Sequence, residues 1–177
     1  HIYGQSCDME GIMQVARRKG IQVMEDAAQD LTVKLNGKQA GTFGDVGTFS
    51  LFSDKVITTG EGGIVVTGSD EIADRLRLLR NQGRPNSGTF IHPSLGMNFR
   101  ITDLQAAIGL GQMEKLPRIL ADRAKKWRLY SEGLAGVGDI RLMRVLKGSD
   151  IVPFRFPIVT ADRENLAKAL EAAGIQT

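Results

Sequence analysis

The stretch at residues 44–68, GDVGTFSLFSDKVITTGEGGIVVTG, constrains the fold more strongly than any other part of the chain. Residues 46–50 and 63–67 are rich in β-branched and aromatic side chains, which predicts two strands. The glycine- and threonine-rich turn between them contains Lys55. A lysine amine becomes a nucleophile when burial or nearby cations lower its pKa, and it can then form a Schiff base with a carbonyl cofactor. A solvated turn lysine is the alternative, because most lysines lie on the surface.

An acidic segment lies upstream of this turn. The apolar run at residues 21–24 ends in Glu25-Asp26-Ala27-Ala28-Gln29, which predicts a parallel strand that delivers an acid at its carboxyl end. Ligands bind at such strand ends in open α/β sheets. Asp26 is therefore a candidate site residue, and a surface or helix-capping acid is the alternative.

Hydrophobic spacing and capping residues predict the remaining elements. Asn36-Gly37 predicts a hairpin turn, and residues 84–100 predict an ordered loop. Thr102 and Gln105 form a capping-box pattern for a helix that ends near residue 114, and Pro117 is expected to start a separate helix. The expected helices are 8–19, 70–80, 102–114, 118–134 and 162–173, and the further expected strands are 21–25, 140–146 and 151–159.

Charge and composition exclude several classes of protein. The net charge is +3, with 23 basic and 20 acidic residues spread along the chain, so the sequence lacks the basic patch of a nucleic-acid binder. It contains no signal-peptide pattern and no apolar run long enough for a transmembrane helix. The single cysteine, Cys7, excludes an internal disulfide and fits a reducing compartment, so a cytoplasmic location is expected. The two histidines, His1 and His92, have no further metal-ligand partners in the pattern, so no metal site is expected.

Several motifs together resemble the pyridoxal-phosphate sugar aminotransferases of the DegT/DnrJ/EryC1/StrS family. They are EDAAQ at 25–29, GDVGTFS at 44–50, Lys55 followed by TTGEGG at 58–63, LRNQG at 79–83 and GMNFRITDLQAAIGLGQ at 96–112. The motifs occur in the family's order and spacing, so the resemblance covers nearly the whole chain. It implies an α/β protein with the three-layer fold type I of pyridoxal-phosphate-dependent transferases.

The resemblance also implies a division of the chain. Residues 1–134 would form the second half of the large cofactor-binding domain, with a mostly parallel sheet. Residues 135–177 would begin a small α+β C-terminal domain. The chain starts at His1 without a methionine, and the family's upstream phosphate loop and ring-stacking aromatic residue would precede it. We therefore expect a fragment of a longer enzyme that holds half of the cofactor site.

The family's functional residues match five positions. Lys55 would bind pyridoxal phosphate as a Schiff base and move the proton during transamination, and Asp26 would keep the pyridine nitrogen protonated. Gln29 would reach the phenolic oxygen, and Ser50 would bind the cofactor phosphate. Asn98 would cross a dimer interface to the phosphate of the neighbouring subunit. A strand-end serine and a plain loop asparagine are the alternatives for Ser50 and Asn98.

The implied reaction moves an amino group, usually from glutamate, onto a nucleotide-linked keto-sugar. The VITTGEGG sequence after Lys55 looks most like members that aminate C4 of 4-keto-6-deoxy sugars, with 3-keto sugars as the nearest alternative. Lys55 favours transamination, because the family's dehydratases have a histidine there. The active site would be shared within a homodimer. The alternatives are a non-catalytic or regulatory relative and, less well supported, a generic nucleotide-binding domain, which needs a glycine-rich turn between a strand and a helix.

One position and one three-residue segment depart from the family pattern. Asp54 precedes the lysine where relatives often have a neutral residue, and it could perturb the lysine or pair with a nearby cation. Asp30-Leu31-Thr32 replaces a run of small residues that is common after the glutamine.

Overall fold

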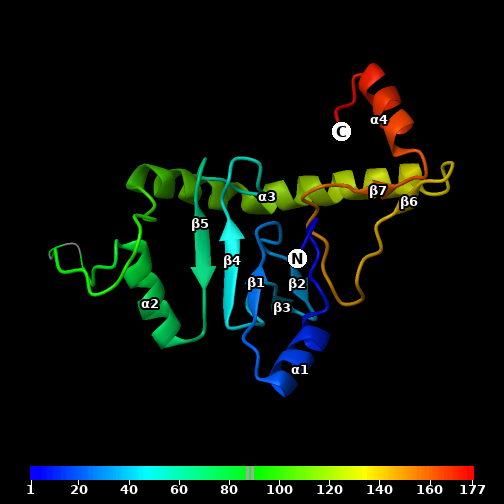
Figure 1. Cartoon of the computed structure of the whole chain (residues 1–177). Coiled ribbons are helices and arrows are strands. Elements are labelled where there is room, and N and C mark those ends of the chain that lie inside the picture. The colour runs from blue at the N-terminus through cyan, green and yellow to red at the C-terminus, as the bar shows by residue number, and fades with distance from the viewer. Residues whose placement is uncertain (87, 89) are drawn as a thin grey trace.

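The computed structural model describes residues 1–86, 88 and 90–177, and its centre is a three-stranded sheet (Figure 1). The strands are β1 (Met24–Asp26), β4 (Val46–Ser50) and β5 (Gly63–Val66), in the order β1-β4-β5. β1 and β4 are parallel, whereas β4 and β5 are antiparallel. This part of the sheet is therefore mixed rather than mostly parallel, because the lysine turn returns the chain directly, without the crossover that a parallel pair needs.

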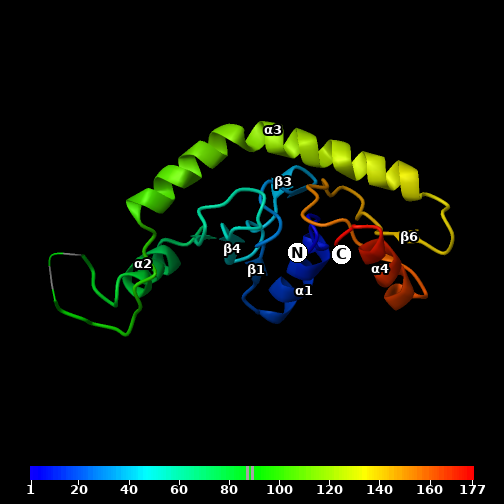
Figure 2. The same cartoon turned by 90° about the horizontal axis from the view of Figure 1, so that it is seen from above.

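Helices lie on both sides of this sheet. Seen from above, α3 (Asp103–Leu134) passes along one side and α1 (Met9–Lys19) lies on the other (Figure 2). α1 begins where the Asp8 side chain accepts a hydrogen bond from the Gly11 amide, and it ends at Gly20, which has a left-handed φ of 63°. The order helix, sheet, helix agrees with the predicted three layers.

Two further predicted elements are confirmed. β2 (Lys34–Leu35) and β3 (Lys38–Gln39) form an antiparallel hairpin. Asn36 and Gly37 both have positive φ, 49° and 82°, as the favoured two-residue hairpin turn requires. α2 (Asp70–Arg80) starts at Ser69, whose side chain accepts a hydrogen bond from the Ile72 amide.

The prediction that Pro117 starts a new helix is wrong, because α3 runs through it. The capping box of Thr102 and Gln105 forms as expected at the start of α3. Leu116, beside the proline, is buried in the core with Leu51, Val56 and Ile57. Burial of such side chains, at about 1.5–3 kcal/mol each, offsets the roughly 3 kcal/mol that an interior proline costs a helix. α3 is visibly bent (Figure 2), and an interior proline is a usual cause of a bend.

The C-terminal strands are shorter than predicted. β6 (Arg141–Leu142) and β7 (Ile158–Val159) form a two-stranded antiparallel ladder. The end of the intervening segment packs on α3 instead: the Phe156 ring lies 4.7 Å from the Trp127 ring and 5.0 Å from the Tyr130 ring. α4 (Arg163–Ala172) follows, capped by Asp162. α3 ends at Leu134, the position of the predicted domain boundary, and the division itself stays a prediction. None of the described helices is long and apolar enough to cross a membrane.

Candidate active site

The turn that holds Lys55 is fixed by backbone bonds and by the core. The Leu51 carbonyl accepts hydrogen bonds from the Thr59 amide (2.9 Å) and the Thr58 hydroxyl (3.1 Å), and the Lys55 amide donates to the Phe52 carbonyl at 3.1 Å. Val56 and Ile57, the next two residues, are buried. The turn is therefore a packed structure that presents Lys55 in a defined direction.

The Lys55 side chain is largely enclosed, with 16% of it exposed. Its Nζ lies 3.4 Å from Asp54 Oδ1 and 4.4 Å from the centre of the Phe154 ring. Arg155 Nη2 donates to Asp54 Oδ2 at 3.2 Å. The unusual Asp54 thus contacts both the lysine and a second cation. The sheltered amine is not the solvated turn lysine of the alternative interpretation.

Asp26 and Glu25 have opposite environments at the end of β1. Glu25 is buried, and its carboxylate accepts hydrogen bonds from the amides of residues 41, 43 and 44 and from the His1 ring. Asp26 is exposed, and its Oδ1 accepts a hydrogen bond from the Ala28 amide at 3.0 Å. It stands opposite Thr48 of β4, the strand that leads to Lys55. Asp26 is therefore the carboxylate of this pair that a ligand can reach.

Gln29 and Ser50 each have hydrogen-bonding capacity left for a ligand. Gln29 Oε1 accepts from the Tyr3 amide at 2.8 Å, and its NH2 group has no acceptor among the described residues. Ser50, the last residue of β4, accepts from the Phe52 amide at 3.2 Å, which leaves its hydroxyl hydrogen free to donate.

Asn98 lies in a different place. It forms an isolated bridge with Asn81 at the end of α2, and its side chain accepts from the Arg100 amide at 3.5 Å. No hydrogen bond among the described residues links its side chain to the other four predicted residues. Its predicted role across a dimer interface stays a prediction, as do the roles of the other four residues.

Two features of the site have no counterpart in the sequence prediction. Phe154 and Arg155 reach the lysine turn from the C-terminal part of the chain, and no local motif marks them. Asp30 is fully buried without a well-aligned hydrogen bond to its carboxylate. Burial raises the pKa of Asp30 to about 7, although the Gly4 amide lowers it in part. The departure from the family pattern at this position could have drawn attention to it.

The available groups fit a pyridoxal-phosphate site. An enclosed amine, an exposed carboxylate, an amide NH2 and a hydroxyl come from β1, β4 and the segments that follow them. These groups are an amine for the cofactor's carbonyl carbon, an acceptor for its ring N–H, and donors for its oxygens. In the described part of the chain, no group of three or more His, Cys, Asp or Glu residues could hold a metal ion.

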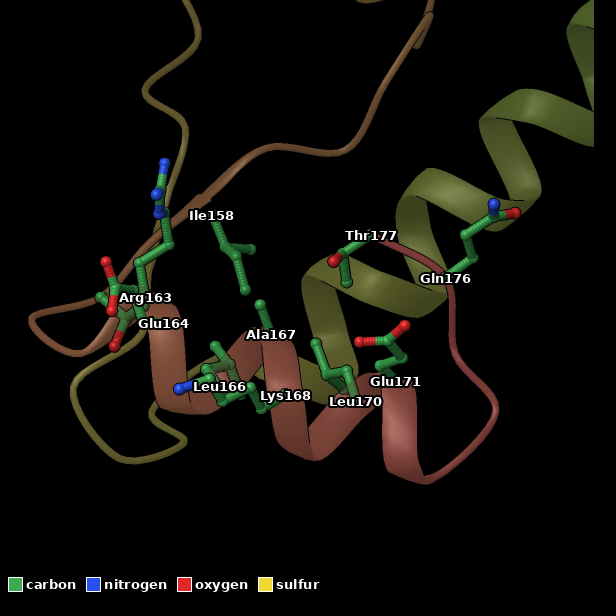
Figure 3. Close-up of a pocket in the computed structure, with 11 residues that line it drawn as sticks. Ile158, Arg163, Glu164, Leu166, Ala167, Lys168, Leu170, Glu171, Gln176 and Thr177 are labelled. Atoms are coloured by element: carbon green, nitrogen blue, oxygen red, sulfur yellow. The ribbon is translucent and has the colours of Figure 1, made fainter.

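A pocket of about 750 Å3 lies elsewhere, between α4 and the C-terminal residues. Figure 3 shows Leu166, Ala167 and Leu170 of α4 at this pocket, together with Gln176 and Thr177. None of the five predicted site residues lines it, so we do not associate it with the chemistry at Lys55.

Comparisons with known proteins show the family of the chain. The model of the DegT/DnrJ/EryC1/StrS aminotransferase family matches residues 1–177. GDP-perosamine synthase of Caulobacter vibrioides is 39% identical over 183 residues, which covers 100% of this chain and 49% of that protein. The UDP-N-acetyl-3-dehydro-alpha-D-glucosamine 3-aminotransferase of Acidithiobacillus ferrooxidans is 38% identical, with 99% of this chain and 47% of that protein covered.

A solved structure of a similar protein has the same fold. The crystal structure of Streptomyces venezuelae DesV in complex with a ketimine intermediate superposes with a TM-score of 0.93 at 35% identity. The match covers 99% of this chain and 47% of the DesV chain. The chain thus spans about half the length of the relatives it matches.

Proposed function

Because the chain belongs to the DegT/DnrJ/EryC1/StrS aminotransferase family, we propose that it is part of an enzyme that transfers an amino group to a nucleotide-linked keto-sugar. Pyridoxal phosphate is the cofactor of this family. The observation that carries the proposal is the enclosed Lys55 amine after β4, with the exposed Asp26 carboxylate at the end of the neighbouring parallel strand.

Each predicted residue has a distinct task in this proposal. Lys55 would hold the cofactor covalently and then carry a proton between substrate and cofactor carbons at its Nζ. Asp26 would accept a hydrogen bond from the ring N–H and keep that nitrogen protonated, because a nearby anion favours the cation. Gln29 would donate to the phenolic oxygen and Ser50 to the phosphate. When bound, pyridoxal phosphate supplies the electron sink for the substrate carbanion.

The substrate is the finer part of the proposal. We propose amination at C4 of a 4-keto-6-deoxy sugar with glutamate as the amino donor, on the basis of the VITTGEGG sequence after Lys55. The similarity to a GDP-perosamine synthase supports this choice, whereas the similarity to a 3-aminotransferase supports the 3-keto alternative. The cytoplasm, where nucleotide-linked sugars are made, is the proposed location.

We further propose a homodimer in which Asn98 serves the neighbouring active site. Apolar side chains are exposed along the loop before α3 and along the first half of α3, which is the surface that an interface would cover. They are Met97, Phe99, Leu104, Leu110 and Met113.

The test uses the complete protein that contains this chain. It would be incubated with pyridoxal phosphate, reduced with borohydride, and digested for peptide mass spectrometry. We expect the cofactor adduct on Lys55, and we expect Lys55→Ala to abolish both the adduct and transamination. Lys38→Ala is the matched control, because Lys38 lies in β3 outside the site.

Two outcomes would decide against the proposal. Substantial transamination by Lys55→Ala would remove the catalytic assignment. A folded wild-type protein without any adduct would favour the alternative, a non-catalytic or regulatory relative with the same fold.

A further inference from the structure

The neighbours of the Lys55 amine come from two distant parts of the chain. Asp54 precedes it in the lysine turn, and Asp54 Oδ1 lies 3.4 Å from Lys55 Nζ. Phe154 comes from the C-terminal part, and Nζ lies 4.4 Å from the centre of its ring. Figures 1 and 2 show the segment that contains Phe154, in orange, passing beside the second half of α3. A carboxylate and the face of an aromatic ring are both favourable neighbours for an ammonium ion.

Two arginines hold these neighbours in place. Arg155 Nη2 donates to Asp54 Oδ2 at 3.2 Å, so the carboxylate contacts one cation through each of its oxygens. Arg123 Nη1 of α3 donates to the Pro153 carbonyl at 2.8 Å and to the Phe154 carbonyl at 3.4 Å, which fixes the backbone that carries the ring. The surroundings of Nζ are therefore built jointly by the lysine turn, the returning segment and α3.

Positive charge predominates around this amine. The Arg155 guanidinium lies 5.1 Å from the centre of the Phe154 ring, so Arg155 and Lys55 share both the ring and the carboxylate. Burial, and then the neighbouring Arg155, lower the pKa of the Arg123 guanidinium. In the part of the chain that the structure describes, Asp54 is the only acid that forms an ion pair with Lys55 or with Arg155. Asp54 is therefore the counter-charge on which both cations depend.

The proposed reaction gives Lys55 a positive charge for part of each cycle. Once its amine is free, it takes a proton from the substrate carbon and later gives that proton to the cofactor carbon. Between these two transfers Nζ is an ammonium ion, although only 16% of the Lys55 side chain is exposed. An enclosed ammonium ion without a counter-charge is costly. The Asp54 carboxylate is placed to offset this cost.

We infer that Asp54 and Phe154 are positioning residues that hold the Lys55 ammonium ion while it carries the proton, an inference that rests on the proposed function. Arg155 orients the Asp54 carboxylate for this task. Because Asp54 departs from the family pattern, the arrangement distinguishes this chain from relatives with a neutral residue there. Phe154 and Arg155 lie beyond the predicted boundary at residue 134, so the smaller domain would contribute directly to the chemistry at Lys55.

The experiment measures the reactivity of this amine without the cofactor. The complete apoprotein would be treated with limiting acetic anhydride at neutral pH, and peptide mass spectrometry would give the acetylation rate of Lys55 relative to Lys38 in the same molecules. Only the uncharged amine reacts, so neighbours that favour the ammonium ion slow acetylation. We expect this relative rate to rise about fivefold in Asp54→Asn, the scale of a partly exposed ion pair. Phe154→Leu, which removes the ring without changing any charge, should raise it about threefold.

The pH dependence separates this role from a change in access to the amine. As pH rises towards about 10, where an ordinary lysine loses its proton, the rates of both variants should converge on the wild-type rate. A change in access would persist at every pH. Asp74→Asn is the matched control, because the same substitution on the exposed face of α2 should leave the Lys55 rate unchanged. In the holoenzyme, Asp54→Asn should lower kcat about fivefold and leave KM for the amino donor unchanged.

Several results would overturn the inference. They are a wild-type Lys55 rate in either variant at neutral pH, an increase that persists at alkaline pH, and an equal increase in Asp74→Asn. The proposed function has a separate test, which is the borohydride-trapped adduct on Lys55 of the wild-type holoenzyme. If that adduct forms and the acetylation rates do not change, only the roles of Asp54 and Phe154 are wrong. If the adduct is absent from the folded wild type, the proposed function fails instead.

Discussion

At the residue scale, the neighbouring acids Glu25 and Asp26 have different environments because of the strand geometry. Successive side chains of a strand point to opposite faces, so Glu25 is buried while Asp26 is exposed. Glu25 holds three amides of residues 41–44 in place and thereby positions the start of β4. The motif EDAAQ made Asp26 a candidate ligand residue. It could not predict the partners of Glu25, which depend on the fold of a distant loop.

Asp26→Ala tests the assignment of the ring nitrogen. We expect the complete variant to keep its borohydride-trapped adduct on Lys55 and to lose kcat by about 10²–10³-fold, because one preorganised charge is removed. Asp74→Ala, on the exposed face of α2, should have activity close to wild type. Near-normal kcat in Asp26→Ala would contradict the role of its carboxylate.

Asp30 should make the stability of the protein depend on pH. Its pKa is raised from the ordinary 3.8 to about 7 in the folded state, so between these values the folded protein keeps a proton that the unfolded chain has lost. The free energy of unfolding should therefore fall as pH rises from about 4 to 7, by an amount on the order of 4 kcal/mol, and level off above 7.

The thermal midpoint of Asp30→Asn, measured across this pH range, should depend less on pH than that of the wild type. Asp74→Asn is the control, because the Asp74 side chain is 78% exposed and should leave the slope unchanged. Equal slopes in the wild type and Asp30→Asn would show that Asp30 is ionised in the folded protein.

At the element scale, local signals predicted the elements that local bonds define. α1, α2 and the hairpin follow from Asp8, Ser69 and Asn36-Gly37, whose bonds lie within a few residues. The predicted helix break at Pro117 and the predicted long strands at 140–146 and 151–159 were wrong, because packing decides the structure in these places. Likewise Phe154 and Arg155 approach Lys55 only through the return of the chain along α3, which no local pattern encodes.

Gly47 in β4 is a sensitive position in the sheet. A Cβ at this residue would lie 1.8 Å from the Gly41 carbonyl oxygen, which is backbone and cannot turn away. Gly47→Ala should lower the free energy of unfolding by about 3 kcal/mol, measured by denaturant titration. Gly68→Ala is the matched control, since its Cβ would meet no atom within 4 Å, and its effect should stay within about 0.5 kcal/mol. A smaller effect for Gly47→Ala than for Gly68→Ala would contradict this close approach.

At the scale of the whole molecule, the distribution of apolar surface indicates further contacts. Leu104 is 80% exposed and Leu110 is 70% exposed, on the first half of α3. Exposed apolar side chains in such numbers are usual where another surface covers them.

Leu110→Glu tests whether the covering surface is a second copy of the enzyme. We expect the complete protein to be a dimer by light scattering and the variant to be largely monomeric, because burying an unpaired carboxylate is costly. Leu129→Glu, on the second half of α3 where the side chain is also exposed, should remain dimeric. A dimeric Leu110→Glu would place the interface elsewhere.

The long helix α3 contacts two functional segments at once. Gln105 Nε2 donates to the Glu61 carbonyl in the lysine turn at 3.0 Å, and Arg123 donates to the Pro153 carbonyl. Between Gln105 and Arg123 the axis rises by about 27 Å, and each residue turns it by about 100°. α3 therefore fixes both the separation and the relative orientation of these two segments. Inserting or deleting a single residue would swing Arg123 away from the lysine side, so natural variation here should preserve length more strictly than residue identity.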